Sequence, residues 1–392
     1  MNEGTATDVT AAHGGRSRQS KKHSKTYRSI SAILSWLTAR RPTTLSTSLR
    51  ARFLPYLLTL AIAWLPWLIL TWPGSMRDDT LAQYLQSSGL HHYYTQHPLF
   101  DTLTFGLFWH IGSALGSPLI GQALYTVTQA VLLAAGCALL LCYIRKIGSP
   151  RWLIGLGLVY LATNYVVVGA ITTMGKDSLH AVFYLPLAVL FVEACLTRGS
   201  VLARRPVAFA FVILLFATIV SKRTALIIVL CAGCLFTPSY LRQWASFLSE
   251  GAWKHTSDGD ADTVAAERLA AIEHDLAPLR GTSDKPQWQK NILRAIHRWV
   301  RSDGRVGVRK GNPLTSMALY VTWIPLAAGL ALAVRPARRR YGPALAAYGL
   351  LAFTVLSLYA SPMALFWYPI PVFLALPLFV VLPFTFRESH PL

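Results

Sequence analysis

Charged side chains are scarce in this sequence, and acidic ones are scarcer than basic ones. Only 14% of the 392 residues are charged, with 17 Asp and Glu against 37 Lys and Arg, whereas 53% are hydrophobic. Soluble domains carry about 25% charged residues. The composition therefore excludes an ordinary water-soluble protein and predicts an all-α, polytopic helical integral membrane protein.

Cysteine is also rare, and all five cysteines lie in apolar runs: Cys137, Cys142, Cys195, Cys231 and Cys234. Cys231 and Cys234 have the spacing of a redox motif, but the strand pattern of a thioredoxin-like unit is missing around them. We interpret the cysteines as small core residues. No Cys, His and carboxylate set has zinc-ligand spacing, so no metal site is predicted. The adjacent carboxylates of Asp78 and Asp79 leave open a divalent cation as cofactor.

The net charge of +20 is concentrated in the N-terminal tail and at the ends of apolar runs. Lys and Arg in such places mark the cytoplasmic side of a membrane and contact lipid headgroups. This distribution predicts membrane lipids as partners, and no nucleic acid.

Apolar runs near the length that crosses a bilayer recur along the chain, and they predict about eight to ten transmembrane helices. The candidate spans are residues 53–72, 118–143, 152–171, 179–196, 206–220, 225–241, 314–334, 343–359 and 364–384. They divide the chain into a disordered basic cytoplasmic arm (1–50), an N-terminal transmembrane module (51–241), a hydrophilic insert (242–312), C-terminal transmembrane helices (313–386) and a short tail (387–392).

Basic residues before the first span, up to Arg50 and Arg52, place the N-terminus in the cytoplasm by the positive-inside rule. The same rule places the arginine-rich turn at 335–340 inside, whereas a count of crossings places it outside. We favour the cytoplasmic position of this turn. It requires either that residues 206–241 cross the membrane only once or that the insert contains one further transmembrane crossing. The insert is too long for the rule, so its side stays open.

Two outward turns carry the polar residues that need an explanation. The first follows Trp72 and contains Asp78 and Asp79, and after it residues 100–115 predict a helix along the outer surface with Asp101 off its apolar stripe. The second turn contains Lys176 and Asp177, followed by Ser178. One interpretation of the acidic pair is a solvated turn that caps the next helix. The functional interpretation is a base held at the membrane surface.

Group transfer at the outer face needs a donor from the membrane, because sugar nucleotides are cytoplasmic. A polyprenyl-phosphate-linked sugar fits this requirement. Asp79 or Asp78 suits the role of a base that takes a proton from an acceptor hydroxyl. Cations suit the stabilisation of the leaving phosphate, and the candidates are Lys176, Arg223 and Arg77.

Other residues complete the candidate binding set. Gln83 lies four positions after Asp79, on the same helix face, and His97 follows in the same loop. Asp177 accompanies Lys176, and Lys222 precedes Arg223 in a third outward turn. Tyr368 is a candidate for stacking on a sugar, or else it belongs to the aromatic belt at the membrane surface.

These motifs carry a resemblance. The combination of Arg77-Asp78-Asp79, Gln83-Tyr84, His97-Pro98-Leu99 and Lys176-Asp177 resembles the GT-C class of membrane glycosyltransferases, in particular protein O-mannosyltransferase-like and aminoarabinose-transferase-like enzymes. It is most similar to an uncharacterised family of bacterial polytopic membrane proteins, with Lys176-Asp177-Ser178 matching outright. Asp79-Thr80 and Arg223-Thr224 stand where that family has Asp-Ser and Arg-Asn.

The resemblance implies a multi-pass glycosyltransferase of the bacterial plasma membrane, with the first-loop aspartate catalytic and a cell-envelope acceptor. The sequence departs from the class in having Asp79 where a glutamate is usual and Phe366-Trp367-Tyr368 where an arginine is expected. Two alternatives remain open: a transporter or flippase for a lipid-linked saccharide, in which the charges line a pathway, and a non-catalytic membrane scaffold.

Overall fold

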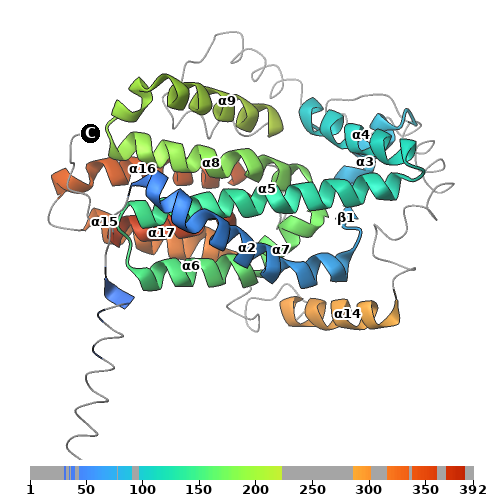
Figure 1. Ribbon diagram of the computed structural model, residues 1–392, viewed down its shortest axis with the longest axis horizontal. Coiled ribbons are helices and arrows are strands. Elements are labelled where there is room, and N and C mark those ends of the chain that lie inside the picture. The colour runs from blue at the N-terminus through green and yellow to red at the C-terminus, as the bar shows by residue number, and fades with distance from the viewer. Residues whose placement is uncertain are drawn as a thin grey trace, which may run out of the picture.

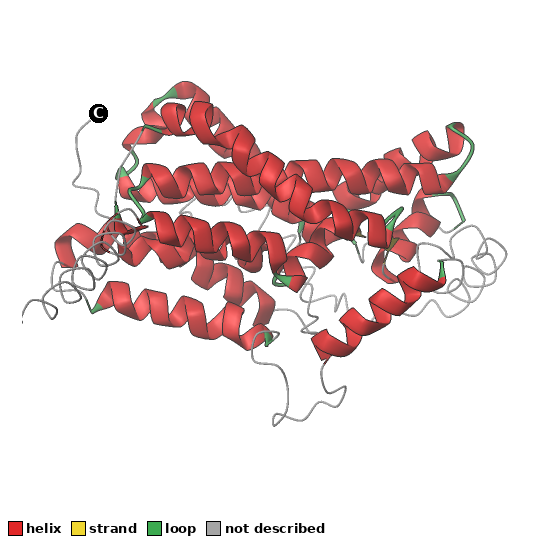
Figure 2. Cartoon of the chain, turned by 60° about the horizontal axis from the view of Figure 1, so that its bottom comes forward, coloured by secondary structure: helices red, strands yellow, loops and turns green. Residues whose placement is uncertain are grey.

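The structure, a computed structural model, describes residues 44–76, 78–90, 97–222, 286–301, 316–334, 338–359 and 368–384, with a few positions between 31 and 39. These ranges are almost entirely helical, and their only strands are β1 (Ser75–Met76) and β2 (Thr173–Met174). Long helices pack side by side with their axes in roughly one direction (Figures 1 and 2). The predicted all-helical class is confirmed.

The described helices have the following bounds, in chain order: α2 (Leu45–Thr71), α3 (Asp78–Ser87), α4 (Leu99–Ala114), α5 (Pro118–Lys146), α6 (Arg151–Thr163), α7 (Tyr165–Thr172), α8 (Lys176–Leu196), η1 (Ser200–Ala203), α9 (Arg205–Ser221), α14 (Gln287–Arg301), η3 (Leu319–Trp323), α15 (Ile324–Ala333), α16 (Arg338–Tyr359), α17 (Ile370–Val381) and η4 (Leu382–Phe384).

Three of these helices, α2, α5 and α8, are long and apolar enough to cross a membrane. The predicted span at 152–171 is instead two helices, α6 and α7, bent by 52° where they meet. The bend occurs at Asn164, whose side chain accepts from the amides of Val166 and Val167 and so begins a new helix. Counted as one broken span, the pair is a fourth candidate.

The other predicted spans correspond to shorter apolar helices or lie outside the described residues. The shorter helices are Arg205–Ser221, Leu319–Ala333, Gly342–Leu358 and Ile370–Phe384. The predicted span at 225–241, most of the insert, most of the basic arm and the C-terminal tail belong to the part of the chain that is not described.

Helix α2 begins at Leu45, inside the predicted basic arm, because Thr44 caps it by accepting from the amide of Thr47. One side of α2 is an exposed apolar stripe that ends beside Trp72: Leu54, Leu58, Ile62, Leu65 and Ile69. An uninterrupted exposed stripe of this kind is typical of lipid contact.

The core lies between α2, α5, α8 and α17 and is built from leucine, valine and aromatic side chains. Fully buried examples are Trp64, Leu140, Tyr184 and Phe373. The Trp64 indole donates to the carbonyl of Leu161 at 3.0 Å, so the large ring is packed without leaving its N–H unsatisfied.

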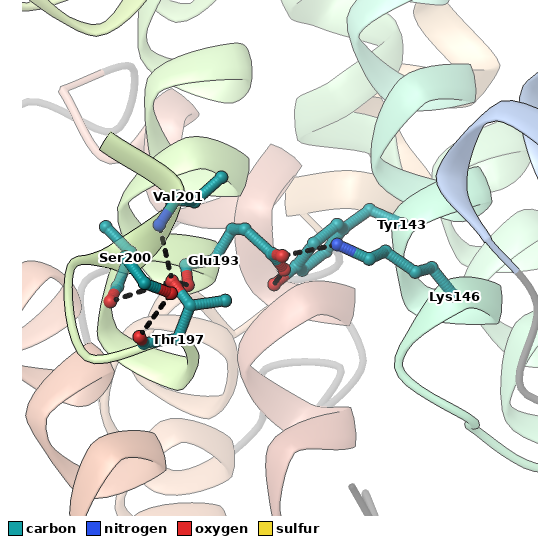
Figure 3. Close-up of polar contacts among 7 residues, drawn as sticks. Tyr143, Lys146, Glu193, Thr197, Ser200 and Val201 are labelled. Atoms are coloured by element: carbon teal, nitrogen blue, oxygen red, sulfur yellow. Dashed lines mark hydrogen bonds and ion pairs between the residues drawn. The ribbon is translucent and has the colours of Figure 1, made fainter. Parts of the chain in front are cut away.

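One end of the bundle collects basic residues and is called the basic end below. It contains Arg50 and Arg52 near the start of α2, together with Arg145, Lys146, Arg151, Arg198, Arg204 and Arg205. Ser48 of α2 donates to the carbonyl of Cys142 at 3.0 Å, which places these ends side by side. Figure 3 shows Glu193 of α8 between Lys146 and Tyr143 of α5, bonded to both.

The last helices run back and forth between the basic end and the opposite end. Tyr184, two turns into α8, bonds to Thr354 near the end of α16 at 2.8 Å, so α16 runs antiparallel to α8 and starts at the basic end. Trp152 at the start of α6 contacts Phe384 at 6.3 Å between ring centroids, so α17 returns to the basic end. The start of α16, with Arg338, Arg339 and Arg340, therefore lies at that end.

Residues 100–115 were expected to form a helix along the outer membrane surface. In the structure they form α4, which packs antiparallel along the first half of α5. Gly112 and Gly121 permit this close approach, because a Cβ on Gly121 would lie 2.1 Å from the carbonyl oxygen of Phe108. The predicted apolar stripe is exposed at Leu103 and Leu107, whereas Asp101, which lies off that stripe, is fully buried. The buried face is the one that carries Phe105 and Trp109.

Candidate functional site

The two predicted outward turns are joined by a two-residue parallel bridge. Ser75 pairs with Thr173 and Met76 pairs with Met174. The Thr80 hydroxyl donates to the carbonyl of Met174 at 2.6 Å and reinforces the bridge. As a result, α3 and α8, which are far apart in sequence, begin side by side at the end of the bundle opposite the basic end; we call this the site end.

Gly74 is required where the first turn passes α5. Its φ is +119°, in the region that favours glycine, and a Cβ there would lie 2.2 Å from the Thr126 hydroxyl oxygen. Gln129, also on α5, donates to the carbonyls of Ala170 and Thr173 at 2.9 and 3.0 Å. Helix α5 thus supports both turns from behind.

The first ion pair of the site joins the two turns. The Lys176 ammonium lies 2.7 Å from a carboxylate oxygen of Asp79. The side chains are 20% and 32% exposed, respectively, so both remain reachable from solvent. Each residue stands in the first turn of its helix, which the bridge fixes in position.

The second ion pair is more deeply buried and joins α8 to the end of α9. The Lys222 ammonium lies 2.6 Å from Asp177, whose side chain is only 3% exposed. Asp177 is in the first turn of α8 and Lys222 follows the last residue of α9, so each charge also has the sign that the helix dipole favours.

Tyr368 connects the two ion pairs. Its carbonyl accepts from Lys222 at 3.2 Å, and its ring centroid lies 5.7 Å from the ammonium of Lys176 and equally far from that of Lys222. An aromatic face at this distance attracts cations. Two lysines and two aspartates therefore surround one tyrosine, and we call these five residues the charged cluster.

A pocket of about 520 Å³, including its open mouth, lies against this cluster. Asp79, Lys176 and Asp177 contribute the charges, and Ile370 and the wall formed by α7 contribute apolar surface. The wall consists of Tyr165, Val166, Gly169 and Ala170. A carboxylate, an ammonium and an apolar wall together suit a ligand with one anionic group and one apolar part.

Asp101, which the sequence places off the apolar stripe of residues 100–115, is a buried carboxyl near the cluster. It is fully buried on α4, and neither carboxyl oxygen has a hydrogen-bond partner among the described residues. Burial raises the pKa of Asp101 well above its ordinary value, and the negative charge of Asp177 raises it further, while Lys176 and Lys222 oppose the shift. In the folded protein the protonated form of Asp101 is therefore favoured more strongly than it is in water.

His180 is a second residue that sequence reasoning missed. Its Nδ1 lies 3.0 Å from the hydroxyl oxygen of Ser221, and the ring is fully buried. Since Ser221 directly precedes Lys222, this contact fixes the end of α9 against α8. The available signal was spacing, because His180 lies one turn after Lys176 and Asp177 on the same helix.

The remaining predicted residues are placed as follows. Gln83 is buried and donates to the Thr102 hydroxyl at 3.2 Å, so it faces α4 and does not line the pocket. His97 is buried immediately before α4. Arg77, Arg223 and the side chain of Asp78 lie outside the described part of the chain.

Metal ligands do not gather in this region. Within the described ranges, no group of three or more His, Cys, Asp or Glu residues is arranged to hold a metal ion.

Comparison of the chain with protein-family models, curated proteins and solved structures found no match.

Proposed function

We propose that this chain is a GT-C-like membrane glycosyltransferase that moves a sugar from a polyprenyl-phosphate donor to a cell-envelope acceptor at the outer face of a bacterial plasma membrane. One observation carries the proposal. Asp79 and Lys176, singled out in two separate turns, form an ion pair at the rim of a pocket beside Asp177, Lys222 and Tyr368.

In the proposed reaction Asp79 is the base. Its carboxylate takes the proton from an acceptor hydroxyl as that oxygen forms a bond to the anomeric carbon of the sugar. The bond between the anomeric carbon and the phosphate oxygen breaks, and its electron pair leaves with the polyprenyl phosphate. Asp79 then returns the proton to water.

The two ion pairs are suited to the gain of negative charge on the phosphate when the sugar is transferred. A sugar phosphodiester carries one negative charge, and the released phosphate monoester carries nearly two at neutral pH. When Asp79 accepts a proton, its attraction for Lys176 falls, and the ammonium becomes available to the leaving phosphate. Lys222 supports the same charge from behind Tyr368. Preorganised cations of this kind stabilise a developing anion strongly, because they need no reorganisation during the reaction.

The distribution of cations supports the proposed orientation. Outside the hydrophilic insert, which is too long for the positive-inside rule, arginine and lysine concentrate at the basic end, and α16 begins there with Arg338, Arg339 and Arg340. By the positive-inside rule that end is cytoplasmic, together with the N-terminus, and the site end faces outward. A lipid-linked donor in the outer leaflet reaches the pocket in this orientation.

The test is the substitution Asp79→Asn in a strain that otherwise lacks the protein. We expect loss of the glycan product, detected by mass spectrometry of cell-envelope glycans, with normal protein level and membrane insertion. Glu193→Gln is the matched control, because it weakens an ion pair at the basic end and leaves the pocket untouched. Unchanged glycans with Asp79→Asn would rule out the assigned base. If the chain were a transporter, loss of its function in Asp79→Asn would leave the intact lipid-linked saccharide on the cytoplasmic side of the membrane.

A further inference from the structure

Helix α14 is the described part of the hydrophilic insert, and its sequence is strongly amphipathic. It contains no acidic residue. At 100° per residue, Trp288, Ile292, Ala295 and Ile296 fall on one side of the helix, whereas Lys290, Arg294 and Arg298 fall on the other. Residues 287–301 of the insert therefore form a helix with one apolar and one cationic face.

A single hydrogen bond fixes where α14 meets the bundle. Gln289, the one polar residue within the apolar face, is buried and donates from Nε2 to the carbonyl of Ile69 at 3.0 Å. Ile69 lies in the last turn of α2, where the exposed apolar stripe of that helix reaches the site end. Helix α14 therefore lies beside the end of the exposed apolar stripe of α2, at the periphery of the bundle (Figures 1 and 2).

The apolar face of α14 is only partly covered by this contact. Leu293 and Ile296, on the side of Gln289, are half-buried, whereas Trp288 and Ile292 remain 53% and 44% exposed. The cationic side chains of Arg294 and Arg298 are exposed next to this apolar edge. An exposed Trp and Ile bordered by arginines have the pattern of helices that lie in the headgroup region of an anionic bilayer.

We propose that α14 is an interfacial helix that binds an anionic phospholipid surface at the site end of the bundle. Trp288 and Ile292 enter the acyl boundary, and Lys290, Arg294 and Arg298 contact headgroup phosphates. Charge complementarity and continuity with the α2 stripe favour a lipid surface over a second copy of the chain or a nucleic acid. The assignment places residues 287–301 on the same side of the membrane as the site, and it holds whatever chemistry the pocket performs.

The test uses the full-length protein, with its own cysteines replaced by serine, reconstituted in phosphatidylcholine vesicles with and without phosphatidylglycerol. A fluorophore is attached at Ile292→Cys and, as the matched control on the polar face of the same helix, at Gln287→Cys. Lipids brominated on the acyl chain serve as the quencher. We expect quenching at position 292, increased by phosphatidylglycerol, and little quenching at position 287.

Charge variants separate a specific lipid contact from general proximity. Arg294→Gln with Arg298→Gln should remove the increase caused by phosphatidylglycerol, whereas Arg204→Gln with Arg205→Gln at the basic end should leave it unchanged. Equal quenching at both labelled positions, or none at position 292, would overturn the proposal. Protection of position 292 that depends on protein density, or on added oligonucleotide instead of lipid charge, would assign the face to a second copy or to nucleic acid.

Discussion

The Lys176 ammonium lies 2.7 Å from the Asp79 carboxylate, although nearly a hundred positions separate the two residues in the chain. The contact exists because β1 and β2 pair in parallel and start α3 and α8 at the same level. Since both side chains are partly exposed and line the pocket, the pair forms a reactive surface as well as a cross-link.

We predict that the positive charge of Lys176 is needed for sugar transfer, in addition to any contribution of the side chain to the stability of the fold. Lys176→Met should lower sugar transfer by about 10²- to 10³-fold, the loss typical when one group that stabilises a developing anion is removed. Lys176→Arg keeps the charge and should retain part of the activity. Product formation in membranes that contain equal amounts of each variant gives the comparison. Equal activity of the Met and Arg variants would contradict a role for the charge.

Removal of Lys222 should destabilise the fold, because it leaves Asp177 buried without its cation. The expected cost of Lys222→Met is about 3–5 kcal/mol, as for other broken buried ion pairs. Adding Asp177→Asn removes the uncompensated charge and should recover part of the lost thermal stability in detergent. A double variant less stable than Lys222→Met would show that the two side chains are not coupled.

Asp101 predicts a specific dependence of stability on pH. Its pKa is raised in the folded protein, so above the ordinary value of 3.8 the unfolded chain releases this proton while the folded chain retains it. Stability therefore falls as pH rises from that value towards the raised pKa, by at most about 1.4 kcal/mol per pH unit. Asp101→Asn keeps the neutral shape and removes this contribution.

The measurement for Asp101 is thermal unfolding of wild type and Asp101→Asn between mildly acidic and neutral pH. The unfolding temperature of the wild type should fall relative to that of the variant as pH increases. Asp79→Asn serves as a control, because Asp79 is partly exposed and ion-paired. Parallel curves for wild type and Asp101→Asn would mean that Asp101 is ionised in the folded state.

The hairpin of α4 and α5 should be intolerant of added volume at Gly121. A Cβ there meets the backbone oxygen of Phe108 at 2.1 Å, and backbone yields less readily than a flexible side chain. Gly121→Ala should cost about 1–3 kcal/mol or more. Gly155→Ala on α6 is the control, since nothing lies within 4 Å of its added Cβ. The unfolding temperatures of the two variants in detergent provide the test.

The proposed orientation predicts opposite labelling at the two ends of the bundle. Ser88 at the site end and Ser200 at the basic end are both exposed. In a variant without other cysteines, Ser88→Cys should react with a membrane-impermeant thiol reagent added outside cells, and Ser200→Cys only after lysis. The reverse pattern would leave the pocket without access to a donor in the outer leaflet.

The helical class and the existence of the two turns followed from the sequence, because run length and the position of charges are local properties. The pairing of Asp79 with Lys176 needed the β1–β2 bridge, and two-residue strands have no periodicity to detect. Lys222 was recognised as part of an outward turn, but Arg223 was preferred as the cation. Spacing alone does not distinguish adjacent cations, whereas the end of α9 directs Lys222 at Asp177.

The orientation of α4 illustrates a different limit. Residues 100–115 were interpreted as a helix along the outer surface, with Asp101 off its apolar stripe. In the fold the opposite face packs on α5, because Gly112 and Gly121 allow the backbones to approach and Phe105 and Trp109 fill the contact. A helix that has apolar residues on two faces does not reveal from its sequence which face is covered.

The bend at Asn164 has a consequence for what the pocket can hold. Residues 165–170 turn away from the axis of α6 and form one wall of the pocket, so the cavity owes its width to a side chain that is not part of its lining. Changes at position 164 would alter the size of the accepted ligand while every charged group stayed in place. Under the proposed function, chains that keep the same charges but differ at this one position would then select different sugars or lipid carriers.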